Sequence, residues 1–253
     1  MAEPKPTPRL TIVVPAHFEE ATIGTTLRAL HDQVRHPFKA LVVYDMDEDP
    51  TATAVHEGSA EWPEAVALKN AYGRGALGAI RTGLDAADTE LVAVVMADLS
   101  DDPAVLNLMI AEADRGADVV SGSRYMRGGK QVGGPVLKSL MSRLAGRSLH
   151  LLTRIPTHDP TNSFRLYRTS FVRGVDVRSR GGFEIGMELT VKAYIAGLTV
   201  AEVPTTWIDR GAGQSKFKLR AWLPLYVHWY LYALRRAPLG IRRNAGKGSP
   251  GAS

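Results

Sequence analysis

The chain of 253 residues contains no cysteine. It therefore has no disulfide framework, no zinc–thiolate site and no thiol nucleophile, which fits a reducing compartment. Long apolar runs are also missing, since no window approaches the ~20 residues that span a bilayer. The run from Leu10 to Ala16 is interrupted by Pro15 and is too short for the core of a signal peptide. We expect a cytoplasmic protein that is soluble or peripherally associated with a membrane.

Acidic residues are scarce at the C-terminal end. From Pro204 onward there are nine lysines and arginines against one acid, Asp209, whereas the whole chain has a net charge of +5. Such a segment favours an anionic partner, namely phosphates, an anionic membrane surface or nucleic acid. Nucleic acid is the least favoured of the three, because no helix-turn-helix, zinc finger or stacking platform accompanies the charge.

Aromatic residues make up 7% of the chain, but they gather in one place. Residues 221–234 hold three of the eight tyrosines and two of the four tryptophans, between Arg220 and the pair Arg235 and Arg236. Such a helix suits a membrane–water interface, and packing on the sheet or in a dimer interface is the alternative. We therefore divide the chain into a main domain (9–215), a basic, aromatic-rich amphipathic segment (216–238) and a tail expected to be disordered (239–253).

The first half of the sequence alternates between strand and helix patterns. Apolar, β-branched runs predict strands at 10–15, 40–45, 65–69, 91–97 and 118–122. Helical spacing of apolar residues predicts helices at 19–34, 74–87 and 103–115. Farther on, the patterns predict helices at 136–152 and 184–196 and a strand at 198–207. This alternation predicts an α/β fold with a mainly parallel sheet and helices on both faces.

Clustered acids follow the fourth predicted strand, in Ala97-Asp98-Leu99-Ser100-Asp101-Asp102-Pro103. The carboxyl ends of parallel strands are where open α/β sheets bind ligands, so acids here suggest a hard metal ion or a sugar. Asp101 and Asp102 have an alternative role as caps of the helix that opens at Pro103. Asp98, at the strand end itself, is the stronger candidate.

Three further motifs follow predicted strands. Residues 15–20 open the first helix, the acidic turn 45–51 could accept hydrogen bonds from a base and a ribose, and the glycine-rich block 73–83 suits close approach to a ligand at a helix start. The glycine spacing is not G-x-G-x-x-G and follows the third strand rather than the first. A dehydrogenase is therefore disfavoured.

Together these blocks resemble the family-2 inverting glycosyltransferases, in particular the dolichyl- or polyprenyl-phosphate mannosyltransferases. The resemblance runs from about Leu10 to Lys216. Besides the blocks already described, it rests on Gly122-Ser123-Arg124-Tyr125, the segment Asp159–Arg165, Gly182-Phe183-Glu184, Glu202-Val203-Pro204, Arg210 and Gly213-Gln214-Ser215-Lys216. It implies a GT-A fold, a nucleotide-diphosphate-sugar donor such as GDP-mannose or a UDP-hexose, and single displacement with inversion.

The resemblance and the motifs together give candidate residues for each role. The resemblance implies that Asp98 holds the metal, Mg²⁺ or Mn²⁺, which would neutralise the leaving diphosphate. The residues themselves offer Ser100 together with donor oxygens, or Asp101 or Asp102, to complete the metal site. The donor-binding candidates are Pro15, His17, Glu19, Asp45, Asp49, Gly75, Asp98 and Arg210. The candidates for binding an acceptor phosphate are Arg124, Lys138, Ser142, Arg210 and Lys216.

The sequence departs from the family pattern at the metal and nucleotide positions. Met96 stands where relatives carry the first carboxylate of Asp-x-Asp, and a thioether is a poor ligand for a hard cation. Ser100 stands where many relatives have glutamine. Tyr44 and Met46 replace acids of the nucleotide turn, and Ala212 replaces a common basic residue. These departures leave the identity of the donor and the strength of metal binding open.

The chemistry of the acceptor decides whether a base is needed. A lipid monophosphate is largely dianionic near neutral pH and needs only positioning by cations such as Arg124. A hydroxyl acceptor needs a base, for which Asp159, Glu184 and Glu188 are candidates, so the expected catalytic set is Asp98, Arg124, Asp159 and Glu188. Asp159 has an alternative role in a turn, and Glu188 as part of a solvated helix surface.

Three functions remain open on the sequence alone. The favoured one is a polyprenyl-phosphate glycosyltransferase at a membrane surface, with a lipid phosphate acceptor. The second is a soluble transferase acting on a small hydroxylated acceptor. The third is a non-catalytic protein that binds sugar nucleotides, which the presence of Met96 suggests. An oligomer is compatible with each of them.

Overall fold

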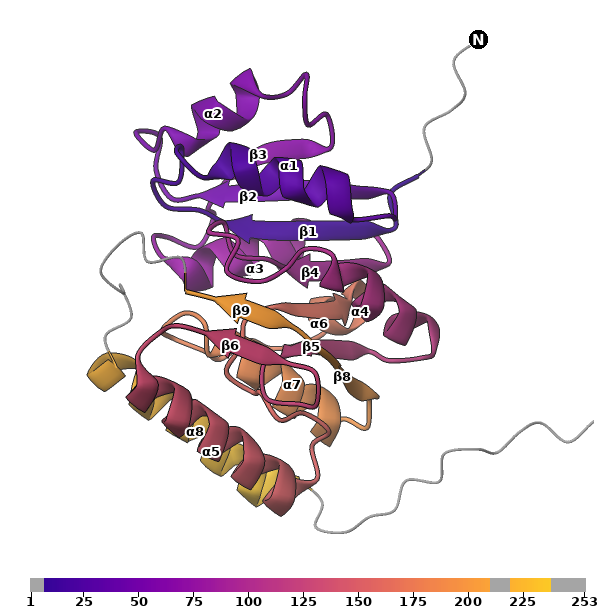
Figure 1. Ribbon diagram of the computed structural model, residues 1–253, viewed down its shortest axis with the longest axis vertical. Helices are drawn as coiled ribbons and strands as arrows, with labels where there is room; N and C mark the ends of the chain where they lie inside the picture. The colour runs from indigo at the N-terminus through magenta and orange to yellow at the C-terminus, as the bar shows by residue number, and fades with distance from the viewer. Residues whose placement is uncertain (1–6, 210–218, 238–253) are drawn as a thin grey trace, which may run out of the picture.

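The computed structural model describes residues 7–209 and 219–237. A seven-stranded sheet in the order β3-β2-β1-β4-β7-β5-β8 forms its centre, and β6 and β9 form a second, two-stranded sheet (Figure 1). The strands are β1 (Leu10–Pro15), β2 (Phe38–Tyr44), β3 (Ala65–Lys69), β4 (Leu91–Val94), β5 (Val119–Ser123), β6 (Lys130–Val132), β7 (Arg165–Arg168), β8 (Val200–Pro204) and β9 (Thr206–Ile208). The helices are α1 (Ile23–Gln33), α2 (Thr51–Glu57), α3 (Ala76–Ala86), α4 (Val105–Asp114), α5 (Val136–Thr153), α6 (Thr169–Arg173), α7 (Ile185–Ile195) and α8 (Leu219–Arg236).

The central sheet is mainly parallel, as the sequence predicted. β1 pairs in parallel with β2 and β4, β2 with β3, and β5 with β8, whereas β7 runs antiparallel between β4 and β5. All six residues of β1 are buried. A strand that is covered on both faces needs apolar side chains in both directions, which is why the parallel strands appear in the sequence as continuous apolar runs.

Several predicted boundaries were wrong. The predicted strand 198–207 is divided at Thr205, because β8 pairs with β5 while β9 pairs with β6. The strand predicted at 91–97 ends at Val94, and the helix predicted from residue 19 begins at Ile23. The antiparallel strand β7 and the short elements α6 and β6 were not predicted.

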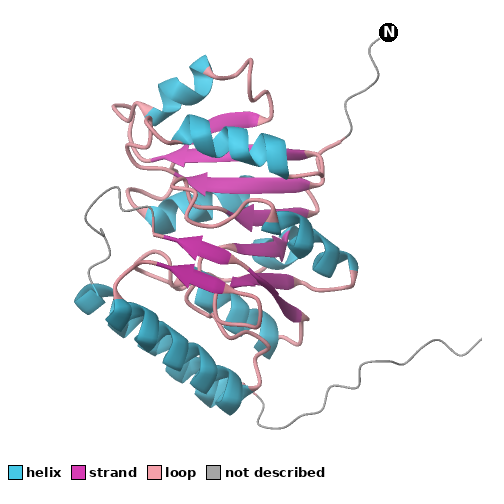
Figure 2. Cartoon of the chain, in the orientation of Figure 1, coloured by secondary structure: helices cyan, strands magenta, loops and turns pink. Residues whose placement is uncertain are grey.

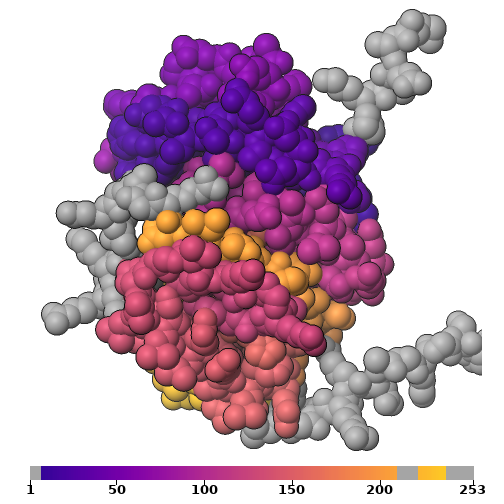
Figure 3. Space-filling model, viewed as in Figure 1, coloured from indigo at the N-terminus to yellow at the C-terminus, as the bar shows by residue number. Residues whose placement is uncertain are grey.

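Helices cover both faces of the sheet (Figure 2). On one face, α1 and α4 pack through residues such as Leu27 and Met109. On the other face, α3 and α7 pack through Ile80 and Leu189. Figure 3 shows the N-terminal segments (indigo) packed directly on the later ones, with no separation into two bodies. The predicted layers are confirmed.

α5 and α8 lie side by side at the end of the sheet that carries β8 (Figure 1). They pack on α7 through a third apolar cluster, in which Leu149 of α5 meets Trp229 and Ala233 of α8. Trp229 is 3% exposed, and the ring of Trp222 stacks on Phe183 with centroids 6.0 Å apart. The tryptophans of α8 therefore turn toward the protein, not outward to an interface as their spacing suggested.

The parallel strands bring their carboxyl ends to one edge of the sheet. There the loops after β1, β2, β3, β4, β5 and β8 meet, and the β6–β9 ribbon crosses the same edge. The ribbon is tied down by backbone hydrogen bonds from Lys130 N–H to the Thr205 carbonyl and from Ile208 N–H to the Ser100 carbonyl. The candidate site must therefore be sought at this edge.

Within residues 7–209 and 219–237, no helix combines the length and the apolar composition that crossing a membrane requires. The predicted disordered tail at 239–253 lies outside the described residues.

Gly146 lets α5 approach the loop that carries Asp159. A Cβ atom at residue 146 would lie 1.9 Å from the carbonyl oxygen of His158. We expect Gly146→Ala to destabilise the protein by about 1–3 kcal/mol, because either α5 or the loop that carries His158 must shift. This loss should occur although alanine favours a helix more than glycine does. Urea unfolding measures the loss. Gly174→Ala is the matched control, since its Cβ would have no neighbour closer than 3.7 Å, and equal stability of both variants would contradict the close approach.

Candidate active site

The loops after β1, β2 and β3 meet around Asp45. Its side chain is 5% exposed. Its Oδ2 accepts the N–H of Gly75 at 2.9 Å, and its Oδ1 accepts the side-chain N–H of Asn70 at 2.8 Å. His17, which is exposed, places Nδ1 3.7 Å from Asp45 Oδ2. Of the donor-binding candidates, the structure brings together His17, Asp45 and Gly75, next to Pro15 at the end of β1.

Asp49 does not fit the predicted contact with a nucleotide. It is 1% exposed, and its carboxylate accepts the backbone N–H groups of Phe18 and Thr51. Burial alone would raise the pKa of Asp49, but the hydrogen bonds from Thr51 and Phe18 outweigh it and lower the pKa. Asp49 therefore fixes the loop 16–19 against the start of α2, while Glu19, whose N–H reaches Thr51 Oγ1, is partly exposed at the rim.

The loop after β4 places Asp98 at the surface of the carboxyl edge. Asp98 is exposed, and its Oδ1 accepts the N–H of Ser100 at 2.9 Å. Between them Leu99 has φ +53°, a left-handed conformation that non-glycine residues rarely adopt. Phe18, in the loop after β1, has φ +56°. Strained residues of this kind cluster at functional sites, and both of these lie at the edge where ligands are expected.

Asp101 is buried beneath Asp98, at 3% exposure. Its Oδ1 accepts hydrogen bonds from Asn162 and Thr205, but Oδ2 has no hydrogen-bond partner among the described residues. Burial is the main cause that raises the pKa of Asp101 to about 7, and the negative charge of Asp98 adds to it. The polar atom without a partner marks a point where a cation or a proton would be stabilised.

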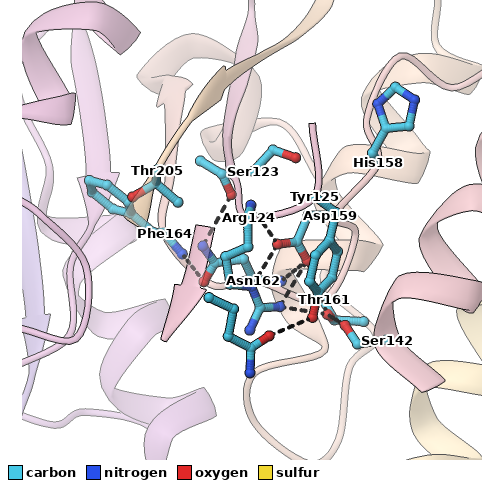
Figure 4. A network of polar contacts seen from close by, with 12 residues as sticks. Ser123, Arg124, Tyr125, Ser142, His158, Asp159, Thr161, Asn162, Phe164 and Thr205 are labelled. Atoms are coloured by element: carbon cyan, nitrogen blue, oxygen red, sulfur yellow. Dashed lines mark hydrogen bonds and ion pairs between the residues drawn. The ribbon is translucent and has the colours of Figure 1, made fainter. Parts of the chain in front are cut away.

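Arg124, at the end of β5, is the centre of a buried ionic network (Figure 4). Its Nε and Nη2 donate to the two oxygens of Asp159 at 2.7 and 2.9 Å, and Nη2 also donates to Thr161 Oγ1. The side chain of Arg124 is 12% exposed and that of Asp159 is fully buried. Nη1 makes none of these hydrogen bonds.

Asp159 does not fit the predicted role of a general base. Burial alone would raise its pKa, but the charge and hydrogen bonds of Arg124 hold that pKa below its usual range. Arg165 is also fully buried and donates to the carbonyl oxygen of Asp159 and to Asn162. A carboxylate that is buried, bound by the guanidinium of Arg124 and near the charge of Arg165 is a weak base, so Asp159 orients Arg124 instead.

Helix α5 also contacts the network around Arg124. Ser142 hydrogen-bonds Thr161, and Arg143 lies 5.2 Å from the centre of the Tyr125 ring. The Tyr125 hydroxyl donates to Gln131, in the β6–β9 ribbon. Lys138 precedes Ser142 by one helical turn on α5. The structure thus brings Arg124 and Ser142 into one cluster, with Lys138 on the same helix.

Glu184 and Glu188 do not fit as bases either. Both are fully buried. Glu184 accepts the backbone N–H groups of residues 180, 181 and 182, and Glu188 accepts those of residues 178 and 179 together with the ammonium of Lys192. The alternative prediction of a solvated surface for Glu188 is wrong as well. These two carboxylates hold the loop 178–182 at the start of α7.

Some predicted site residues cannot be placed, and other site residues were not predicted. Arg210 and Lys216 lie outside the described residues. Tyr125, Arg143, Thr161 and Arg165 belong to the network but were not singled out as site residues. The block 159–165 was visible as a motif, but its side-chain partners in other segments lie 19 or more positions away, such as Ser142 for Thr161 and Arg124, 35 positions from Asp159, so no local pattern revealed them.

The comparison with known proteins agrees with this arrangement. The model of Glycosyl transferase family 2 matches residues 11–175. An undecaprenyl-phosphate mannosyltransferase of Micrococcus luteus is 31% identical over 82% of this chain and 87% of its own length. A dolichol-phosphate mannosyltransferase of Pyrococcus furiosus is 28% identical over 88% of this chain, which spans 63% of that protein.

Solved structures show the same fold. Glucosyl-3-phosphoglycerate synthase from Mycobacterium tuberculosis, with Mn²⁺, UDP-glucose and phosphoglyceric acid, aligns with a TM-score of 0.68 over 90% of this chain and 80% of that one, at 14% identity. The fold is therefore that of the GT-A glycosyltransferases. The chain belongs to glycosyl transferase family 2.

Proposed function

We propose that this glycosyltransferase moves a hexose from a nucleotide-diphosphate sugar to a polyprenyl-type lipid phosphate, with inversion at the anomeric carbon. The observation that carries the proposal is that Asp159, Glu184 and Glu188 are all fully buried and engaged by protein donors. These were the candidate bases, and a hydroxyl acceptor needs one. A phosphate monoester, whose second pKa is about 6, carries its own nucleophilic charge.

In this mechanism the protein positions the acceptor phosphate. Arg124 is held in a fixed orientation by Asp159 and Thr161, so Nη1 can donate a charge-assisted hydrogen bond with little loss of side-chain entropy. Lys138, on the helix that carries Ser142, would add a second cation. Arg210 and Lys216 are expected to complete the set. The names of the two mannosyltransferase relatives support a lipid phosphate as the acceptor.

The donor would bind along the ends of β1 to β4. His17 and Asp45 would contact the base and ribose, with Glu19 at the rim and Gly75 leaving space for close approach. The relatives are named mannosyltransferases, while the aligned synthase was solved with UDP-glucose. GDP-mannose and UDP-hexoses are therefore both used as donors in the experiment described below.

A divalent cation fits the residues that are present. Asp98 and Asp101 offer carboxylate oxygens, one of them buried without a partner, and Ser100 adds a hydroxyl. Among the described residues no cluster of three or more acids or histidines could enclose a metal. This suits Mg²⁺ or Mn²⁺ held by one or two carboxylates and completed by substrate phosphates. When bound, the ion would stabilise the charge of the leaving diphosphate.

A screen of nucleotide release tests the proposed reaction. Purified protein is incubated with GDP-mannose, UDP-glucose or UDP-galactose and Mn²⁺, with or without polyprenyl phosphate. We expect one donor to release its nucleoside diphosphate at least tenfold faster when the lipid phosphate is present. Stimulation by 3-phosphoglycerate or a simple sugar instead would favour a soluble hydroxylated acceptor. Donor binding without turnover with any acceptor would favour a non-catalytic sugar-nucleotide-binding protein.

A further inference from the structure

The outer side of α5 is apolar and open to solvent. Six of its aliphatic side chains are between 49% and 82% exposed, namely Val136, Leu137, Leu140, Leu144, Leu151 and Leu152. Leu137, Leu144 and Leu151 are spaced by seven residues, which is two helical turns, so they lie in one row along the helix. Isolated exposed leucines are ordinary on a protein surface, but a continuous row is not.

The row continues onto α8. There Leu223, Val227 and Leu231, spaced by four residues, are 40–43% exposed. The two helices touch where the Tyr230 hydroxyl donates to Ser148. Val227 is one turn before Tyr230, and Leu144 is one turn before Ser148, so the exposed groups adjoin across the helix contact. We call these nine side chains, six from α5 and three from α8, the leucine face.

The charged residues that α5 and α8 themselves carry have one sign. Neither α5 nor α8 contains an aspartate or a glutamate. Both carry exposed arginines, Arg143 and Arg147 on α5 and Arg235 and Arg236 on α8. A second copy of this face would bring arginine against arginine, whereas an anionic bilayer offers apolar chains to the leucines and phosphates to the guanidinium groups. The charge pattern therefore favours lipid over self-association.

The inner side of α5 reaches the candidate acceptor site. Ser142 hydrogen-bonds Thr161, which also contacts Arg124, while Leu140 and Leu144, two positions to either side of Ser142, are exposed. One helix, about 10–12 Å across, thus separates the leucine face from the buried ionic network around Arg124. A lipid phosphate could reach Arg124 while its chain stays in the bilayer.

We propose that the leucine face docks this protein on an anionic lipid bilayer, with α5 supplying the larger part of the apolar contact. The part of the inference that concerns delivery of the acceptor rests on the proposed function, but docking itself does not. The tryptophans of α8 do not contribute to this contact, since Trp229 is buried and Trp222 packs on Phe183.

Co-sedimentation with vesicles of phosphatidylcholine containing about 30% phosphatidylglycerol tests the docking. We expect the wild-type chain to bind, less strongly as salt rises, and the double variant Leu137→Glu, Leu144→Glu to lose at least tenfold in partition coefficient. Leu108→Glu on α4 is the matched control, because Leu108 is 50% exposed and belongs to another face, and it should bind as the wild type does. Val227→Glu on α8 should weaken binding in the same direction.

Two results would overturn the proposal. One is equal sedimentation of the double variant and Leu108→Glu, with circular dichroism showing both folded. The other is a dimer of the wild-type chain in sedimentation velocity that is absent in the double variant, with no vesicle binding by either protein. A second copy of the chain would then be the occupant of the leucine face.

An activity assay with a short, water-soluble prenyl phosphate separates docking from catalysis. The double variant should keep its turnover with the soluble acceptor and lose it with vesicle-borne acceptor. Vesicle binding with no turnover on either acceptor would refute the proposed function and leave docking intact. Equal turnover of wild type and double variant on the vesicle-borne acceptor would refute delivery from the bilayer.

Discussion

Replacing Asp98 by asparagine is expected to lower kcat by at least about 100-fold, because metal coordination contributes several kcal/mol to the stabilisation of the leaving diphosphate. The asparagine side chain would keep the oxygen that accepts the Ser100 N–H, so the turn should remain intact while the charge is lost. Steady-state kinetics with the donor found in the screen measures the effect. The affinity for the free nucleoside diphosphate in Mn²⁺, measured by calorimetry, should fall in parallel.

Asp102→Asn is the matched control for this variant. Asp102 lies in the same loop, is also exposed, and its carboxylate accepts the Ala104 N–H at the start of α4. Its replacement should change kcat by less than about twofold, since it loses a charge away from the proposed metal position. Full activity of Asp98→Asn, or wild-type activity that EDTA does not reduce, would contradict the metal assignment.

Replacing Asp159 by asparagine is expected to lower the free energy of unfolding by about 3–5 kcal/mol, because it leaves the buried guanidinium of Arg124 without its counter-ion. The pKa of Asp159 is lowered in the folded state, so its stabilising effect is complete above the unfolded pKa of about 3.9 and is lost as pH falls through the folded value. Urea unfolding should therefore show a difference in the free energy of unfolding between wild type and variant that is constant near neutral pH and becomes smaller at acidic pH.

The pair Asp176–Arg178 provides the control for Asp159. Both side chains of this pair are 72% exposed, so Asp176→Asn should leave the stability unchanged within error. A general base would behave differently. If Asp159→Asn kept its stability while kcat fell strongly and the acidic limb of the kcat profile disappeared, the role of Asp159 as a base would be restored.

That the proposed donor-binding residues gather at one edge of the sheet could be predicted because it depends on local sequence. The residues His17, Asp45 and Asp98 each follow an apolar run, and the connection of parallel strands through helices brings such positions to one edge. The strand that was missed, β7, has arginine at both ends and carries the fully buried Arg165. Composition alone argues against burying such a segment, and only its partners in β5 and α7 make burial favourable.

The sequence by itself determined the fold class, the family and the edge at which the proposed donor-binding residues gather, because burial on both faces of a parallel sheet forces apolar runs that end where ligands bind. The tertiary structure decided which carboxylates are available. Asp159, Glu184 and Glu188 look alike in the sequence, but each is buried against donors from other segments. It also decided which side of α5 and α8 meets solvent. Periodicity shows which residues share a helix face, but only packing against α7 determines which face is covered.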